Sequence, residues 1–415
     1  MQALVYSQSA PFYLLRRALS SILPRRFFRL ISGLKLKEIP FKPPGPDWVI
    51  LRNRLCGICG SDLQLLRGRD SLLMEPYGSF PAVLGHEIVA EVVSTPAESS
   101  WHPGDRVVVE PLITCVERGL TPCGYCARGK YNLCENSSGG GLAPGNFTGY
   151  NRSVGGGMAE YMAAHVSRLI RLPDNLPDET AVLTDSLASA LQPVLDHFPD
   201  NSDTVVIYGA GILGQHMIRA LRVLGSSAHI VAVARHEFQV DLARSGGADT
   251  VLRSPGRAGL GKAVGARFLP TTLGGGNLEG GADLFFDCVG SSRSLQEGLL
   301  VLRPSGKLIM VGTASSLRRV DFSSLWFREL HFVGSMAFAH SRFQGHNVRT
   351  YQKAVDLLAN GNYDAKGLLT HMFPLQDYCK AFEHAYDRCR YQSVKVAMDL
   401  RENHRGFGVR VISLF

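Results

Sequence analysis

The hydrophobic and polar positions of the chain change their pattern twice. From residue 38 to about 170, short β-like runs such as residues 48–55 and 106–110 stand among many glycines, prolines and cysteines, which is typical of a loop-rich, mostly β domain. From about 176 to 335, apolar strands alternate with helical stretches, beginning with the run TVVIYGAG at residues 204–211. This alternation indicates βαβ units, and hence a parallel sheet with helices on both faces.

The segment after residue 340 carries two helical patterns, at residues 348–360 and 376–388, and the strand-like run VKVAMDL. It is too short for an independent domain, so we expect it to pack back on the first one. The predicted organisation is a mostly β domain over residues 1–175, a doubly wound α/β domain over residues 176–338, and a C-terminal return to the first domain over residues 339–415.

The composition narrows the class of protein. With 415 residues, 45% of them hydrophobic and 19% charged, the chain can bury sizeable cores, which excludes disorder and coiled coil as overall descriptions. No apolar run approaches the roughly 20 residues of a membrane-spanning helix, and the first ten residues lack the pattern of a secretory signal. Six of the nine cysteines form two clusters, which indicates metal ligation in a reducing compartment; we therefore expect a cytoplasmic protein.

The net charge of +8 is a local feature. Residues 1–37 hold seven basic residues and no acidic one, so 37 basic and 36 acidic residues remain in the rest of the chain, and no nucleic-acid partner is expected. Within the basic insertion, residues 9–33, apolar side chains recur at helical spacing and Pro24 interrupts them. Such a segment can lie on an anionic membrane surface, but we expect it rather to cover an active-site mouth or a subunit interface.

A glycine pattern marks a candidate nucleotide site. Gly209, Gly211 and Gly214 lie where a predicted strand runs into a predicted helix, the context that the dinucleotide-binding fingerprint requires. The helix N-terminus offers free N–H groups to a pyrophosphate, and the ends of two later strands should lie beside it. The residues expected to bind the cofactor are Gly209, Ala210, Gly211, Ile212, Leu213, Gly214, Arg235, Val289, Gly290 and Val311.

The cofactor preference is predicted from one position. The fingerprint expects an acidic residue about 20 positions on, where it would bind the ribose hydroxyls of NAD. Ala234 stands there and Arg235 follows it, so NADP(H) is predicted over NAD(H). The alternative is that Arg235 is a solvated residue after a strand.

The second cysteine cluster has the spacing C-x7-C-x2-C-x7-C. Four thiolates with a central C-x2-C pair can close a tetrahedral zinc site without an open position, which is structural rather than catalytic. The sequence therefore predicts a zinc lobe over residues 111–136. Its ligands would be Cys115, Cys123, Cys126 and Cys134.

Several motifs together resemble one protein family. The strings GICGSD at residues 57–62 and GHE at residues 85–87, followed by the four-cysteine lobe and the dinucleotide fingerprint, resemble the zinc-containing medium-chain dehydrogenase/reductase family, which is alcohol dehydrogenase-like. The polyol and threonine dehydrogenase branches are the most similar. The resemblance extends from MQALVY to VKVAMDL and implies a GroES-like catalytic domain followed by a Rossmann domain.

The resemblance also implies a catalytic zinc site. Its ligands fall on Cys59 and His86, with Asp185 as an acidic third ligand and Glu87 as an alternating or outer carboxylate. Three such ligands leave a fourth position for water or substrate. Asp185 departs from the family's glutamate, and Ser186 from its proline. In the cysteine lobe, the family's first ligand position falls on Leu120, and an insertion would bring Cys115 into that role.

The implied reaction is hydride transfer between NADP(H) and an alcohol or carbonyl substrate, in the class of secondary alcohols, polyols, sugars or amino-alcohols. Ser61 would begin a proton relay, but Gln64 stands where the family commonly has histidine, so another group or water must continue it. Two alternatives stay open: a zinc-bearing reductase of activated C=C bonds, and a non-catalytic cofactor-binding protein on the same fold. A homodimer or homotetramer is expected.

Overall fold

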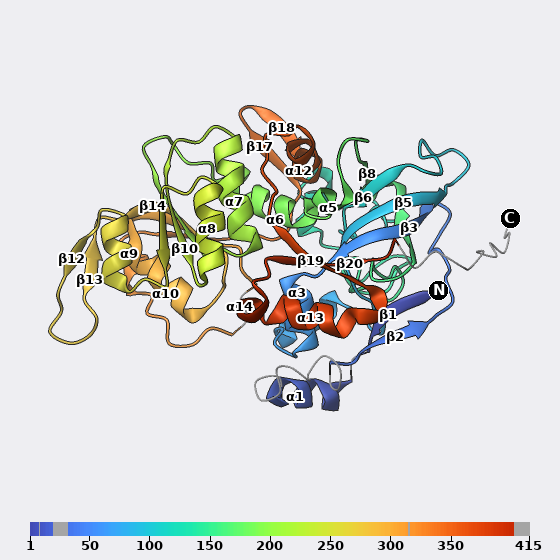
Figure 1. The fold of residues 1–415 in the computed structure, drawn as a ribbon, viewed down its shortest axis with the longest axis horizontal. Coiled ribbons are helices and arrows are strands. Elements are labelled where there is room, and N and C mark those ends of the chain that lie inside the picture. Colours follow the sequence, from blue (N-terminus) through green and yellow to red (C-terminus); the bar gives the residue numbers. More distant parts are fainter. Residues whose placement is uncertain (8, 20–31, 314–315, 402–415) are drawn as a thin grey trace.

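The computed structural model describes residues 1–7, 9–19, 32–313 and 316–401 (Figure 1). A sheet of the doubly wound type lies in one half of the molecule, and a mostly antiparallel sheet lies in the other. The segments drawn in red, from the C-terminal part of the chain, lie beside the blue N-terminal elements rather than with the yellow and orange ones that precede them.

The first sheet is completed by the end of the chain. Its order is β19-β20-β3-β5-β6-β8, with β7 pairing with β3. β20 pairs antiparallel with β3 and parallel with β19, so the C-terminal segment does return to the N-terminal sheet. The strands are β3 (Trp48–Gly57), β5 (Glu87–Ser94), β6 (Arg106–Val109), β7 (Tyr161–His165), β8 (Leu169–Arg171), β19 (Leu369–Pro374) and β20 (Lys395–Asp399).

The basic insertion lies between two paired strands. β1 (Gln2–Tyr6) pairs antiparallel with β2 (Leu34–Glu38), and β4 (Ala82–Val83) pairs with β1 on its other side. Between β1 and β2, helix α1 (Ala10–Leu19) is held by two long-range contacts: Tyr13 donates to the Asp70 carbonyl at 2.8 Å, and Arg16 donates to the Tyr6 hydroxyl at 2.7 Å. Pro24 and the predicted break there lie outside the described residues.

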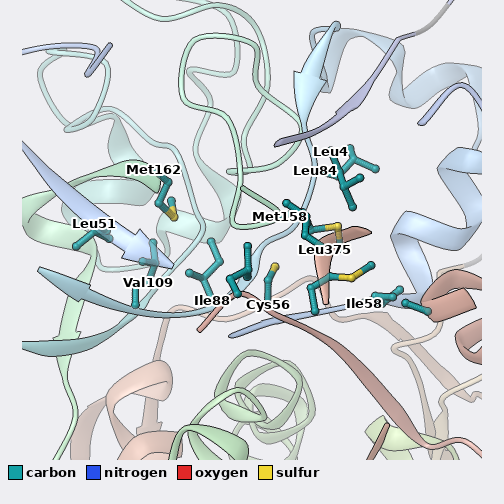
Figure 2. Close-up of a cluster of buried hydrophobic side chains, with 14 of the residues drawn as sticks. Leu4, Leu51, Cys56, Ile58, Leu84, Ile88, Val109, Met158, Met162 and Leu375 are labelled. Atoms are coloured by element: carbon teal, nitrogen blue, oxygen red, sulfur yellow. The ribbon is translucent and has the colours of Figure 1, made fainter. Parts of the chain in front are cut away.

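The core of this half packs one face of the sheet against β1 and the returning C-terminal segment. Figure 2 shows Leu51, Ile88 and Val109 on the strands together with Leu4 and Leu375 from the two ends of the chain. Cys56 is part of the same apolar cluster and is completely buried. Its environment is that of a core side chain, although it stands only three residues before Cys59.

The second sheet has six parallel strands in the order β11-β10-β9-β14-β15-β16. This is the order 3-2-1-4-5-6 of doubly wound dinucleotide-binding folds, which confirms the predicted fold class. The strands are β9 (Thr204–Tyr208), β10 (His229–Ala234), β11 (Thr250–Arg253), β14 (Ala282–Asp287), β15 (Leu302–Met310) and β16 (His331–Gly334). The connecting helices are α7 (Ile212–Val223), α8 (Glu237–Ser245), α9 (Arg257–Ala263) and α10 (Ser292–Val301).

Shorter elements complete the described chain. The helices are α3 (Gly60–Leu66), α4 (Gly124–Ala127), α5 (Asp178–Ala181), α6 (Thr184–Asp196), α11 (Ser323–Phe327), α12 (Thr350–Ala359), α13 (Tyr378–Tyr386) and α14 (Arg388–Tyr391), with 3-10 turns η1 (Leu72–Tyr77), η2 (Tyr131–Leu133), η3 (Val166–Arg168) and η4 (Leu375–Asp377). Two hairpins pair β12 (Arg267–Leu269) with β13 (Asn277–Glu279) and β17 (His340–Phe343) with β18 (His346–Arg349). In the described residues, no helix is long and apolar enough to cross a membrane.

The prediction of one helix over residues 376–388 is wrong. Asp387 leaves the helical region of the backbone at φ −88° and ψ 62°, which ends α13, and its side chain accepts a hydrogen bond from the Arg390 amide to begin α14. An aspartate that satisfies a new helix start competes with continuation of the old helix. Arg388 is thus the first residue of α14.

Candidate functional site

Three potential metal ligands meet at the edge of the first sheet. Cys59 is the residue before α3, and His86 and Glu87 stand at the start of β5; their ligand atoms all lie within 4.8 Å of one another. The turn before His86 requires glycine, because Gly85 has φ +98° and a Cβ there would lie 2.5 Å from the Cys56 sulfur. The two sequence motifs, GICGSD and GHE, are therefore brought together by the pairing of β3 with β5.

Glu87 already has a cationic partner. The Lys395 ammonium, on β20, donates to both carboxylate oxygens of Glu87 at 2.6 Å, and both side chains are almost completely buried. Lys395 was not predicted from the sequence. A lysine inside the apolar run VKVAMDL could have indicated a buried ion pair, because the strand is buried on both sides and a charge there needs a partner.

Asp185 lies beside this cluster without belonging to it. It is the second residue of α6 and is 6% exposed, and its carboxylate falls outside the group whose atoms lie within 4.8 Å. Burial raises the pKa of Asp185 to about 7; the charge of His86 lowers this pKa and that of Glu87 raises it. Its Oδ2 atom is buried and has no hydrogen-bond partner, an unfavourable state for a carboxylate that a cation would relieve.

An outer layer of hydrogen bonds surrounds His86 and Ser61. Asp62 lies 3.7 Å from His86 Nδ1 and accepts from the Cys59 amide at 2.9 Å. The Tyr150 hydroxyl lies 2.7 Å from Asp62 and 2.9 Å from the Ser61 hydroxyl. Burial raises the pKa of Asp62, and it raises the pKa of Tyr150 well above its usual value, so the phenol keeps its proton. Tyr150 was not foreseen, because it follows a glycine-rich loop without a motif of its own.

The residues present fit a zinc ion. A thiol, an imidazole and two carboxylates form the type of donor set that Zn²⁺ accepts. The buried Nδ1 atom of His86, like Oδ2 of Asp185, has no hydrogen-bond partner.

The four-cysteine lobe is closed in the structure. The sulfur atoms of Cys115, Cys123, Cys126 and Cys134 all lie within 4.8 Å of one another, and those of Cys115 and Cys134 are 3.6 Å apart. The Cys115 sulfur accepts from the Cys123 amide at 3.2 Å and from the Asn136 side chain at 3.1 Å, as a thiolate ligand would. The insertion after Cys115 therefore does bring this residue into the cluster.

The glycine turn has the geometry that the fingerprint demands. Gly209 has φ +106°, and a Cβ there would lie 2.5 Å from Val289. A Cβ on Gly214 would lie 2.2 Å from the Gly209 carbonyl, so α7 can approach β9 closely only with glycine at this position. Gly211 precedes α7, whose first amides have no partner within the helix.

The ends of β14 and β15 adjoin this turn. The Asp287 carboxylate accepts from the Val289 and Gly290 amides at 2.9 Å, and its carbonyl accepts from the Val311 amide at 3.0 Å. Together with the contact between Val289 and Gly209, these bonds place the predicted cofactor residues at one edge of the sheet.

Two arginines stand at this edge. Arg235 is exposed directly after β10. Arg388 was not predicted; one of its terminal nitrogens would lie 3.6 Å from a Cβ on Gly211. Burial lowers the pKa of His236, and the nearby charges of Arg235 and Arg388 lower it further. Burial also lowers the pKa of Arg388, whereas the charge of Cys59 raises it. The Arg388 guanidinium is therefore close to the glycine turn and within electrostatic range of the Cys59 thiol.

Two family models match the chain in succession. The model described as "Alcohol dehydrogenase GroES-like domain" matches residues 45–174, and the model described as "Zinc-binding dehydrogenase" matches residues 213–360. The chain belongs to the zinc-containing medium-chain dehydrogenase/reductase family. The expected resemblance is confirmed, and with it the combination of a GroES-like domain and a Rossmann domain.

Relatives of this medium-chain dehydrogenase/reductase cover most of its length. It is 27% identical over 353 residues to an L-threonine 3-dehydrogenase from Aeromonas salmonicida, which covers 85% of this chain and 92% of the relative. It is 29% identical over 356 residues to an L-threonine 3-dehydrogenase from Pyrococcus furiosus, with 85% and 91% covered. Together with the family, these relatives identify the chain as an alcohol dehydrogenase-like oxidoreductase.

Solved structures share the fold. A zinc-binding dehydrogenase from Sinorhizobium meliloti bound to NADP superposes with a TM-score of 0.71 at 24% identity, covering 90% of this chain and 97% of that one. An alcohol dehydrogenase from Escherichia coli CFT073 complexed with NADH superposes with a TM-score of 0.73 at 20% identity, covering 96% and 99%. These neighbours carry different nicotinamide cofactors.

Proposed function

We propose that this protein transfers a hydride between NADP(H) and an alcohol or carbonyl substrate in the secondary alcohol, polyol, sugar or amino-alcohol class. The observation that carries the proposal is the meeting of Cys59, His86 and Glu87, with the unpartnered carboxylate of Asp185 beside them. Arg388 lies near Gly211 and is influenced electrostatically by Cys59, which supports a cofactor site close to the metal cluster.

Zinc would be held at two places. Cys59 and His86 would bind the catalytic ion with Asp185 as the acidic ligand, while Glu87 exchanges between the ion and the Lys395 ammonium. The four-cysteine lobe would hold the second ion. When bound, the catalytic ion supplies Lewis-acid polarisation of a substrate oxygen, and the nicotinamide supplies the hydride exchange.

The chain itself must move the hydroxyl proton. Tyr150 has one proton, and Asp62, which only accepts when ionised, takes it in a hydrogen bond of 2.7 Å. The Ser61 hydroxyl, 2.9 Å away, is then free to donate to the phenol oxygen. We infer that the Ser61 hydroxyl accepts the substrate proton as it gives its own proton to the Tyr150 oxygen, while the phenol proton passes to the Asp62 carboxylate, which replaces the partner that Gln64 does not supply.

Cofactor choice would depend on Arg235. Its guanidinium is exposed at the end of β10, the strand end that holds the adenosine ribose in this fold. A guanidinium is suited to a 2′-phosphate, because it offers paired donors and a permanent charge. Arg388, near Gly211, would bind the pyrophosphate.

The names of the relatives support one part of the proposed substrate class. The relatives from Aeromonas salmonicida and Pyrococcus furiosus are named for L-threonine, a secondary alcohol with an amino group. The acidic ligand Asp185 supports substrates that carry several polar groups. We therefore place amino-alcohols first in a panel with polyols and sugars.

The deciding experiment measures metal content and turnover together. The purified protein should hold two zinc ions per chain, Cys59→Ser should hold one and lose turnover, and Cys115→Ser should lose the other. Cys389→Ser, at an exposed cysteine, is the control. Oxidation of a secondary alcohol with NADP⁺ supports the proposal. Reduction of enones alone, or no turnover by a protein that binds both zinc and NADP⁺, would refute it.

A further inference from the structure

A buried chain of hydrogen bonds joins the helix of Asp185 to the helix of the glycine turn. His216, on α7, is completely buried. Its Nδ1 lies 2.5 Å from the Tyr363 hydroxyl, and its Nε2 lies 3.0 Å from the Ser186 hydroxyl on α6. Neither the predicted cofactor site nor the predicted metal site uses these side chains, yet Ser186 is the residue next to Asp185.

One assignment of the protons satisfies both ends of this chain. The Ser186 hydroxyl donates to the Leu183 carbonyl, 3.1 Å away, and its oxygen accepts from Nε2–H of His216. The Nδ1 atom of His216 then accepts from the Tyr363 hydroxyl. Burial lowers the pKa of His216 well below its usual value, in accord with a neutral ring. All the donors and acceptors are satisfied in one tautomer.

This chain of hydrogen bonds helps to fix the beginning of α6, where Oδ2 of Asp185 has no hydrogen-bond partner among the described residues. Asp185 has a buried oxygen without a partner, so its orientation depends on the backbone that carries it. That backbone is tied through Ser186 to α7, which begins directly after Gly211. Arg219 on α7 also donates to the Asp364 carbonyl at 2.8 Å and so secures the loop of Tyr363.

We propose that His216 is a positioning residue, which acts through Ser186 to hold Asp185 toward the catalytic metal. The inference rests on the proposed function, since it concerns the third ligand of that site. Ser186 stands where the family resemblance expects proline, which has no hydroxyl and could not make the bond to His216. Groups that orient metal ligands typically contribute 10- to 100-fold to metal affinity.

The test measures the rate at which the as-purified enzyme releases zinc to a chromogenic chelator. Two phases are expected, one for each zinc ion, and the phase that is absent in Cys59→Ala belongs to the catalytic ion. His216→Met should release that ion at least 10-fold faster, and the lobe zinc at an unchanged rate. His216→Gln keeps a donor and an acceptor and should restore slow release. Ser186→Ala should behave like His216→Met, and the double variant should be no worse than either.

The matched control is Gln192→Met. Gln192 is buried on the same helix and accepts from the Ala339 amide and the Thr350 hydroxyl, at the end of α6 remote from Asp185. It should lower the melting temperature without changing zinc release.

Normal zinc release from His216→Met, or from Ser186→Ala if His216→Met does not fold, would overturn the proposal. If Cys59→Ser keeps both zinc ions, the proposed function fails first and this inference fails with it.

Discussion

The buried pair of Lys395 and Glu87 shows that a charged side chain without access to solvent requires a partner of opposite charge. Both side chains are almost free of solvent, and the ammonium contacts both carboxylate oxygens. Attraction between two desolvated charges offsets their desolvation only while both are present. A carboxylate of the metal cluster is therefore paired with a residue 308 positions away in the chain.

Lys395→Met should destabilise the protein by about 3–5 kcal/mol, because it leaves Glu87 buried without a partner. Chemical denaturation of the purified enzyme measures the loss. The double variant Glu87→Gln/Lys395→Met should recover part of it, and Lys380→Met, at an exposed lysine, should change stability by less than about 0.5 kcal/mol. A double variant as unstable as the single one would contradict this account.

Arg235→Ala should raise the KM for NADPH by about 10- to 100-fold, the equivalent of one charged hydrogen bond to phosphate, and leave the KM for NADH unchanged. Steady-state kinetics with both cofactors measures the effect. Arg244→Ala removes an exposed arginine from the adjoining helix α8 and is the control. Equal changes for both cofactors would show that Arg235 does not select the phosphate.

Residues that share a local motif could be predicted from the sequence, and residues that reach the site from far along the chain could not. Cys59 and His86 carry the spacing of their motifs. Lys395, Arg388 and Tyr150 have no motif, and only the folded chain brings them to the site. For Cys115, the five-residue shift hides the local pattern, but four clustered cysteines were sufficient to predict its partners.

Among the elements, the four-cysteine lobe depends on a buried charge cluster. Arg168 lies 2.7 Å from Glu117 and 3.2 Å from Glu110, and the Glu117 carboxylate accepts from the Thr114 amide just before Cys115. Burial alone would raise the pKa of Glu117, but Arg168 and the hydrogen bonds lower it to about 2. The lobe is thus attached to η3 by ionic contacts, in addition to the apolar contacts of Leu112, Ile113 and Tyr131.

This depressed pKa predicts an acid-sensitive attachment. Stability from ionised Glu117 is complete above its ordinary pKa of 4.5 and is lost as the pH falls from 4.5 to about 2, with a magnitude of about 3 kcal/mol. Glu117→Gln should lower stability at pH 7 by an amount of this order and flatten the dependence between pH 5 and pH 2.5. Denaturant unfolding across that range is the measurement, with the exposed Glu135→Gln as control. A parallel pH dependence in both variants would refute it.

The elements with regular periodicity were predictable, and the short irregular ones were not. The alternation of strands and helices from β9 to β15 correctly indicated a parallel sheet. The hairpins β12–β13 and β17–β18 were not predicted, because the periodicity of three- and four-residue strands is too short to distinguish them from loops. The division of the last helix at Asp387 depends on a side-chain cap that composition alone does not reveal.

At the scale of the molecule, the charge excess lies near the N-terminus, and the described part of the insertion, α1, contacts its own domain. Arg16 is 3% exposed and donates to Tyr6, so at least this basic side chain is turned inward. The domain limits at residues 175 and 338 stay predictions, as do the cytoplasmic location and the oligomeric state.

Deleting residues 10–32 removes five of the seven N-terminal basic residues. If the insertion covers the enzyme rather than a membrane, the full chain and the deletion should sediment equally little with vesicles of anionic phospholipid. Vesicles of neutral phospholipid are the control. Retention of the full chain alone on anionic vesicles would reverse this interpretation.

The pairing of β20 with β3 also determines when, during translation, the first sheet can be completed. The strand that completes the first sheet, and the lysine that neutralises Glu87, are translated roughly 340 residues after β3, a delay of about 20 to 70 s at ribosomal rates of 5–20 residues per second. By the end of that interval all six strands of the nucleotide-binding sheet have been translated, while the β19–β20 side of β3 is still an unpaired strand edge. The nucleotide-binding sheet can therefore form before the buried partner of Glu87 exists.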